Sequence, residues 1–299
     1  GINTAAAAYN ISFLGGTNDV TDAMTFLNTG VVTLGNGDSD SLLFRGGLIA
    51  TAPSRVNVRG RVNVATDKVL TLGDNDTGVF VSGMTVIGGV STGNITVAAV
   101  TLADGAGLTV GGNTASNISV ASVAGTASGA TSDLTFNTAG TVTVTGNVGT
   151  DIGTITLTRG EGITFQGTVD AGSLTIANDV AAATKVLSFE ENVTLTTGMT
   201  VGTGSFDMSL TGANNSIAGD TTFANTGTVT LGDATGDRID FTGGLTATAP
   251  AKVVAAGTIE TSNASMSLGT VQMSADTTLN TVNSPGANIT IGTLSGTDD

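Results

Sequence analysis

The feature that most constrains this sequence is a short strand signal that recurs about every ten residues along the chain. Val31–Leu34 (VVTL), Thr141–Val144 (TVTV) and Thr154–Leu157 (TITL) are examples. Each alternates apolar residues with Thr, Ser or Asn, which is the period of two expected of a strand with one buried face. Clusters rich in Gly, Asn and Asp separate the signals, because these residues accept the backbone conformations of tight turns. No stretch shows a convincing 3.6-residue period, so the sequence predicts an all-β protein.

One segment of the chain is repeated nearly two hundred residues later. Asn28–Pro53 and Asn225–Pro250 are identical at 16 of 26 aligned positions, without a gap. A fainter third copy gives degenerate repeats near residues 24–60, 134–165 and 221–257. The matching glycines, Gly30, Gly140 and Gly227, are 110 and then 87 residues apart. Both distances are whole numbers of coils of about 22 or about 28 residues, so we expect these glycines at equivalent corners of a coiled chain.

Two all-β architectures compete: a stack of sandwich-like domains and a single β-solenoid. Sandwiches use longer strands and usually bury Trp or Tyr, whereas aromatic residues are only 4% of this chain and Trp is absent. Short strands of aliphatic residues are suited to stacking on copies of themselves one coil above and below. We therefore predict one continuous, elongated β-solenoid domain over residues 1–299, with roughly ten coils and a length on the order of 50 Å. Val32, Leu34, Val229 and Leu231 should point inward and Thr230 outward.

Composition excludes several functions. The net charge of −15 argues against binding to nucleic acid or to anionic membranes. No run approaches the roughly 20 apolar residues of a membrane-spanning helix, so we expect no transmembrane segment. The chain has no His and no Cys, which removes the most common general base and the thiol nucleophile. We therefore expect that the protein is not an enzyme.

Two acidic turns are candidate calcium sites. GNGDSDS contains Asp38 and Asp40, and GDNDTG contains Asp74 and Asp76. Carboxylate oxygens crowded around flexible turns suit a hard cation. The alternative is a pair of exposed turns without metal, and we expect no other cofactor.

Five of the nine basic residues fall within 24 positions: Arg45, Arg55, Arg59, Arg61 and Lys68. Arg59 and Arg61 would share a face if a strand continues through Gly60. One interpretation is a docking patch for an acidic partner. The other is a solvated surface that offsets a strongly acidic molecule.

The pattern Asn-[Ile/Val]-[Ser/Thr] recurs at Asn10, Asn94, Asn117, Asn192 and Asn288. Each match is also a glycosylation sequon, which a chain rich in Asn and Thr generates by composition. We favour asparagines at the coil corners that hydrogen-bond to the neighbouring coil as a ladder.

The segments Ile163–Asp179 and Asn192–Gly212 are typical of secreted β-helix surface proteins of Gram-negative bacteria. The chain therefore resembles filamentous-haemagglutinin-like adhesins and autotransporter passenger domains. The resemblance is one of general sequence pattern and extends over almost the whole chain. No active residue of those families can be assigned to this sequence. It implies a right-handed parallel β-helix at the cell surface or secreted from the cell.

The expected function is therefore an extracellular structural protein, a rod or filament subunit on the bacterial surface or in the matrix. An adhesin segment that binds surface glycans is the alternative, followed by a carbohydrate-active β-helix enzyme. Strand signals at Tyr9–Leu14 and Asn288–Leu294 lie close to both ends, without a recognisable cap. The expected partners are other copies stacked end to end, or neighbouring coils of a longer chain.

Overall fold

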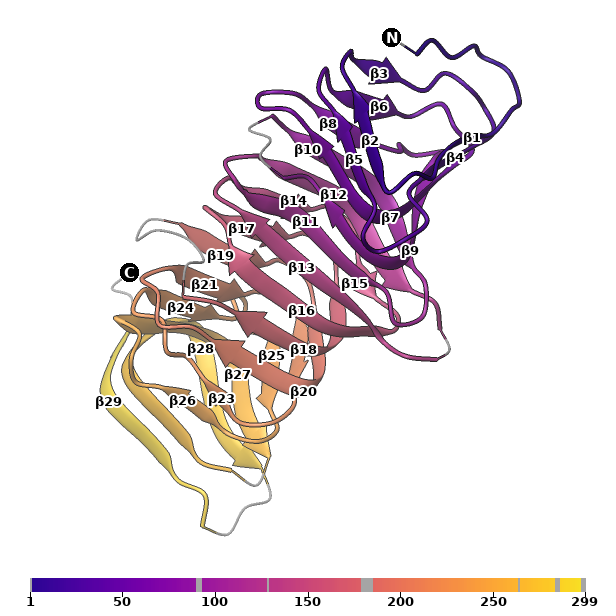
Figure 1. The fold of residues 1–299 in the computed structure, drawn as a ribbon. Coiled ribbons are helices and arrows are strands. Elements are labelled where there is room, and N and C mark those ends of the chain that lie inside the picture. Colours follow the sequence, from indigo (N-terminus) through magenta and orange to yellow (C-terminus); the bar gives the residue numbers. More distant parts are fainter. Residues whose placement is uncertain are drawn as a thin grey trace. The chain divides into compact units, whose positions relative to one another are not determined.

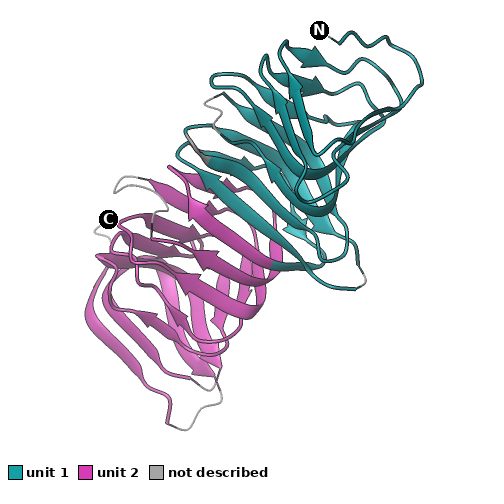
Figure 2. Cartoon of the chain, viewed as in Figure 1, with its two compact units in different colours: residues 1–153 teal, residues 154–299 magenta. Residues whose placement is uncertain are grey.

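The computed structural model describes residues 2–89, 93–127, 129–178, 185–262, 264–282 and 286–296. All regular structure in these residues is β, and none of it is helical. The chain divides into two compact units, residues 1–153 and 154–299 (Figures 1 and 2). Each unit is a β-solenoid of parallel strands, and the chain makes about 12 turns. The predicted fold class is therefore confirmed.

In unit 1, three ladders of parallel strands run from coil to coil. The β4 ladder is β1–β4–β7–β9–β10–β12–β15. The β5 ladder is β2–β5–β7–β9–β11–β13, and the β6 ladder is β3–β6–β8–β10–β12–β14. Strands that belong to two ladders turn a corner of the coil. The strand bounds are β1 (Ile11–Phe13), β2 (Thr17–Val20), β3 (Met24–Thr25), β4 (Val31–Leu34), β5 (Ser41–Phe44), β6 (Leu48–Ala50), β7 (Arg55–Val64), β8 (Leu70–Leu72), β9 (Gly78–Ile87), β10 (Ile95–Leu102), β11 (Gly107–Thr114), β12 (Ile118–Gly125), β13 (Ser132–Thr138), β14 (Val142–Val144) and β15 (Val148–Gly149).

Unit 2 is built in the same way. Its β24 ladder is β17–β19–β21–β24–β27–β28–β29, and its β25 ladder is β18–β20–β22–β25–β27–β28. Its β26 ladder is β16–β18–β20–β23–β26–β28–β29. The strand bounds are β16 (Ile152–Arg159), β17 (Ile163–Phe165), β18 (Val169–Ile176), β19 (Val186–Phe189), β20 (Val193–Val201), β21 (Asp207–Leu210), β22 (Asn214–Ile217), β23 (Thr221–Thr222), β24 (Thr228–Leu231), β25 (Arg238–Phe241), β26 (Leu245–Ala247), β27 (Lys252–Ser262), β28 (Met266–Val282) and β29 (Ile289–Gly296).

The register between the strands decides the coil length. Five steps of the β4 ladder lead from Val32 to Val148, which gives about 23 residues per coil. Of the two lengths that the sequence leaves open, the shorter one is therefore correct. The shorter coil also explains why the chain makes more turns than the ten expected.

The three matching glycines share a local geometry but not one ladder. Gly30 precedes β4, whereas Gly140 precedes β14, which belongs to the β6 ladder. The expectation of equivalent corners is thus wrong for this pair, because coil lengths vary and the distance between the two glycines is not a whole number of coils. A Cβ added to Gly30, Gly140 or Gly227 would lie 2.2–2.4 Å from a backbone carbonyl oxygen of the preceding coil. Only glycine allows the chain to pass so close to its neighbour.

The inside of each unit is filled by the alternating aliphatic residues. Val32, Leu34, Val229 and Leu231 are fully buried, and Thr230 between the last two is partly exposed, as the alternation predicts. Phenylalanine fills the remaining space: the rings of Phe165 and Phe189, which are register partners, stack at 4.9 Å.

The internal repeat reappears as a repeated structure. Seven strands of unit 1, β1–β7, have counterparts β21–β27 in unit 2; β4 and β24, for example, begin 197 residues apart. Gly35 and Gly232 both have a positive φ, of 80° and 73°, in the turn that follows β4 or β24. The two copies therefore fold alike, and one copy can be used to interpret the other.

Candidate functional site

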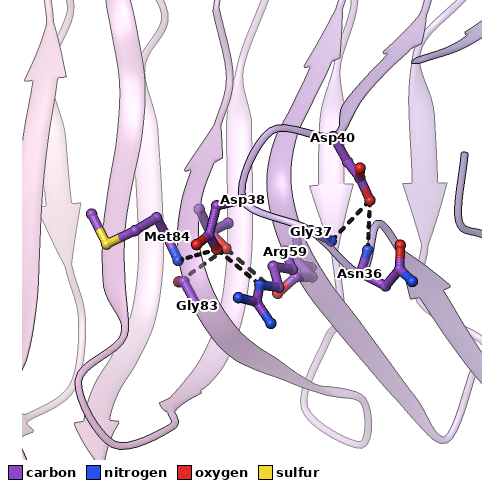
Figure 3. Close-up of polar contacts among 9 residues, drawn as sticks. Asn36, Gly37, Asp38, Asp40, Arg59, Gly83 and Met84 are labelled. Atoms are coloured by element: carbon purple, nitrogen blue, oxygen red, sulfur yellow. Dashed lines mark hydrogen bonds and ion pairs between the residues drawn. The ribbon is translucent and has the colours of Figure 1, made fainter. Parts of the chain in front are cut away.

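The first candidate calcium turn lies between β4 and β5 (Figure 3). Asp40 Oδ2 accepts hydrogen bonds from the backbone N–H groups of Asn36 and Gly37, at 2.8 and 2.9 Å. Asp38 Oδ1 accepts from Arg59 Nε at 2.8 Å and from the N–H of Met84 at 3.0 Å. The two carboxylates thus serve different N–H donors.

The second candidate turn lies between β8 and β9, at another corner of the coil. Asp74 Oδ1 accepts from the N–H groups of Asp76 and Thr77, both at 3.0 Å, which closes the turn. In the described part of the chain, no group of three or more His, Cys, Asp or Glu side chains is placed to hold a metal ion. Calcium at these four aspartates remains an untested hypothesis, and the geometry gives it no support.

The internal repeat indicates what Asp40 does. Its counterpart Asp237 accepts from the N–H groups of Asp233 and Ala234 at 2.8 and 3.0 Å. Asp40 and Asp237 are only 8% and 7% exposed. Because this geometry persists where GNGDSD has become GDATGD, the carboxylate closes the turn and has a structural role.

Asp233 adds a second carboxyl to this turn in unit 2. Burial raises its pKa above the ordinary value, and the hydrogen bond with Asp237 and the charge of Asp237 add to the shift. Asn36 occupies the corresponding position in unit 1. The charge of Asp233 therefore opposes folding, and the first copy avoids it.

Arg45 and Arg59 each form an ion pair with an aspartate. Arg45 contacts Asp19 with Nη2–Oδ2 at 2.6 Å and Nε–Oδ1 at 2.8 Å. Arg59 pairs with Asp38 at 2.8 Å. These hydrogen bonds hold the pKa values of Asp19 and Asp38 below their ordinary range. Each pair links residues that lie in different coils.

The remaining three basic residues lie apart from one another. The guanidinium of Arg55 lies 5.4 Å from the ring centre of Phe80, Arg61 is exposed, and Lys68 is exposed between β7 and β8. Strand β7 does run through Gly60, but this glycine has a φ of 82° and the register shifts there. Arg59 and Arg61 both lie on the outward side of β7, on either side of the corner at Gly60. A docking patch formed by all five residues stays a hypothesis.

An ion cluster in unit 2 was not found from the sequence. Arg238 Nη2 contacts Asp240 Oδ2 at 3.2 Å and also contacts Glu260 Oε1. Asp240 and Glu260 are register partners on adjacent coils, with side chains only 13% and 9% exposed. One guanidinium thus offsets the charge of two largely buried carboxylates. Glu260 lies 20 positions after Asp240 and 22 after Arg238, so only the length of this particular coil brings it to them.

Corner asparagines link consecutive coils. The Oδ1 atoms of Asn10, Asn117 and Asn192 accept hydrogen bonds from backbone N–H groups of the next coil at 2.8, 3.1 and 2.8 Å. The predicted contact with the neighbouring coil is confirmed for these three. The donors are backbone N–H groups, joined at Asn117 by the hydroxyl of Thr141, and not asparagine side chains, so the ladder of like side chains is wrong for these three. Glycosylation at the sequons stays a hypothesis.

A shallow depression of about 290 Å³ lies on the β6 ladder of unit 1. Its lining includes Asn94, Thr96, Asn117, Ser119 and Thr143. Amide and hydroxyl groups of this kind donate and accept hydrogen bonds, as the hydroxyl groups of sugars do.

The first and last coils have uncovered edges. Among the described strands, β1, β2 and β3 pair only with β4, β5 and β6, and β29 pairs only with β28. Tyr9 and Leu14 are 39% and 48% exposed, and Ile289 and Leu294 are 39% and 55% exposed. The strand signals expected near both ends are confirmed as β1 and β29. Beside β3 the N-terminal segment already covers the edge, because Thr4 Oγ1 donates to the carbonyl of Thr25 and accepts from the N–H of Leu27. Strands β1, β2 and β29 offer backbone groups and apolar side chains to a further strand.

Comparison with protein-family models, curated proteins and solved structures gives no match. No helix in the described ranges has the length and apolar character needed to cross a membrane. The function must therefore be argued from the geometry of the chain itself.

Proposed function

We propose that the chain is an extracellular structural protein, a subunit of a β-solenoid rod or filament on the bacterial surface or in its matrix. The observation that carries this proposal is the pair of uncovered edges on the first and last coils. A strand edge with exposed apolar residues favours pairing with another parallel coil. A head-to-tail contact of this type propagates into a filament when it does not close into a ring.

The side chains described above support a structural role. The aspartates close turns, the arginines pair with carboxylates, and the corner asparagines link coils to one another. We assign the chain no catalytic role, and measured turnover of an acidic polysaccharide would contradict this assignment. The resemblance to secreted β-helix surface proteins is the support for placing the protein outside the cell.

Negative-stain microscopy and sedimentation of the purified chain test the proposal. We expect filaments, and sedimentation that depends on protein concentration. The control is the same chain without residues 1–14, which removes β1 and should reduce assembly. If both forms stay monomeric at high concentration, assembly by copies of this chain fails, and neighbouring coils of a longer chain become the better partner.

The second candidate is an adhesin segment that binds glycans, and the polar depression on unit 1 favours it. Saturable binding of a glycan by the monomer would support this function. Ser119→Ala should then weaken binding, whereas Thr230→Ala, a substitution of an outward residue in unit 2, should not. Equal binding by both variants would show that the depression is not the glycan-binding site.

A further inference from the structure

The turn between β4 and β5 contains the only Asn-Gly step of the chain, Asn36–Gly37. Asparagine is a chemically labile residue, and a following glycine favours its deamidation because no side chain hinders attack by the glycine nitrogen. In this reaction the nitrogen of Gly37 loses its proton and bonds to Cγ of Asn36, while the carboxamide C–N bond breaks and ammonia leaves. Water then opens the cyclic imide to aspartate or isoaspartate. The turn thus contains a potential modification site.

The folded turn holds both reacting groups (Figure 3). The backbone N–H groups of Asn36 and Gly37 donate to Asp40 Oδ2 at 2.8 and 2.9 Å. When the carboxamide of Asn36 is turned so that its Nδ2 faces acceptors, Nδ2 donates to the same Oδ2 atom at 3.0 Å. It also donates to the carbonyl of Leu14 in the preceding coil at 3.1 Å. One carboxylate oxygen therefore binds the attacking nitrogen and the leaving group.

This contact opposes the reaction. The nitrogen of Gly37 can attack only after it loses the proton that it donates to Asp40, and a carboxylate at this distance disfavours the negative charge that remains. Asp40 is only 8% exposed, so water competes little for its hydrogen bonds. Asn36 itself is exposed and Gly37 is partly exposed. Protection of the step therefore depends on the carboxylate and not on burial of the reacting pair.

The second copy of the turn shows what the product would be like. Asp233 and Ala234 occupy the positions of Asn36 and Gly37, and the N–H of Ala234 donates to Asp237 Oδ2 at 3.0 Å. Burial raises the pKa of Asp233, and its hydrogen bond with Asp237 and the charge of Asp237 add to the shift. Deamidation of Asn36 would place the same unfavourable second carboxyl in the first turn.

We propose that Asn36 is the deamidation site of this chain, and that Asp40 is a positioning residue that protects it in the folded state. The protection acts through the hydrogen bond from the N–H of Gly37 and the contact with the Asn36 carboxamide. Opening of the turn, or loss of the carboxylate, allows ammonia to leave and converts Asn36 to aspartate or isoaspartate. This chemistry does not depend on how copies of the chain assemble, so it can fail while the proposed function stands.

Peptide mapping by mass spectrometry tests the proposal. The folded chain is incubated at mildly alkaline pH, and deamidation is measured at each asparagine from the mass gained when –NH₂ is replaced by –OH. A synthetic peptide of residues 31–44 gives the unprotected rate. We expect Asn36 to react at least about tenfold more slowly in the folded chain than in the peptide, and Asp40→Ala to remove most of this difference. In the chain unfolded in urea, Asn36 should react faster than every other asparagine.

The internal repeat supplies matched controls. Asp237→Ala removes the same contacts from the second copy, so it should leave the rate at Asn36 unchanged. Gly37→Ala should suppress deamidation in the unfolded chain as well, and Ala234 shows that this turn accepts alanine. Asp40→Asn keeps an oxygen that can accept from the N–H of residue 37 but has no charge, so it should restore part of the protection lost in Asp40→Ala.

Equal rates at Asn36 in the folded chain and in the peptide would overturn the protection. Equal acceleration by Asp237→Ala and Asp40→Ala would show that stability of the chain, and not this contact, sets the rate. Faster reaction at another asparagine in urea would overturn the site. If circular dichroism shows that Asp40→Ala does not fold, Asp40→Asn decides: an unchanged rate at Asn36 would contradict a role for the charge of Asp40.

Discussion

The stack of inward side chains should determine stability, and Leu231 is the position at which to measure it. Leu231 is fully buried on the β24 ladder, with Leu210 on one side and the smaller Ala255 on the other. Leu231→Ala would therefore place alanines at two register positions of adjacent coils and leave a cavity that Ala255 cannot fill. Replacements of a buried leucine by alanine cost about 2–5 kcal/mol, and we expect at least about 3 kcal/mol here. The adjacent Thr230→Ala, on the outward side, should change stability by less than about 0.5 kcal/mol.

Urea denaturation followed by far-UV circular dichroism is the appropriate assay, since the chain has no Trp and a single Tyr to report by fluorescence. For an unfolding slope of about 2–3 kcal/mol per molar urea, a loss of about 3 kcal/mol moves the midpoint by about 1 M or more. Leu34→Ala, the same substitution in the first copy, is the internal comparison. Leu34 lies between Phe13 and Val58, which are larger neighbours than Ala255. Equal midpoint shifts for Leu231→Ala and Thr230→Ala would refute the assignment of inward and outward residues.

Three further predictions test the corners and the charges. Gly227→Ala should destabilise the fold by about 1–3 kcal/mol in thermal melts, because the new Cβ would lie 2.2 Å from a carbonyl oxygen. The control Gly236→Ala should be close to neutral, because a Cβ at that position meets no atom within 4 Å. The pKa of Asp38 is lowered in the folded chain, so its ion pair stabilises the fold above the ordinary value of 3.8. That stabilisation should disappear in a pH titration as the pH falls through the folded pKa, and Asp38→Asn should remove this dependence. The pKa of Asp233 is raised, so its charge opposes folding above that pH range. Asp233→Asn should raise the melting temperature at pH 7 and leave it unchanged at pH 3, and a lower melting temperature at pH 7 would contradict this.

Local sequence determined the strands and their orientation. Alternation of apolar and polar residues gave the buried positions Val32, Leu34, Val229 and Leu231, because a strand presents successive side chains to opposite faces. The repeated segment likewise predicted a repeated structure, since the same turns and apolar positions recur in both copies. The short aliphatic strands also favoured a solenoid over sandwich domains, which is the architecture observed.

The ladder to which a strand belongs could not be read from the sequence in this way. Gly30 and Gly140 occur in similar segments but precede different ladders, and the asparagine of one coil finds its backbone partner 20 or more residues later. The ion cluster of Arg238, Asp240 and Glu260 depends on the same register. The physical reason is that alternation is a property of each strand by itself. The register between two coils depends on the summed lengths of all the strands and corners between them, and the corners differ in length. The sequence by itself therefore determined what faces inward, and only the tertiary structure decided which residues of successive coils lie side by side.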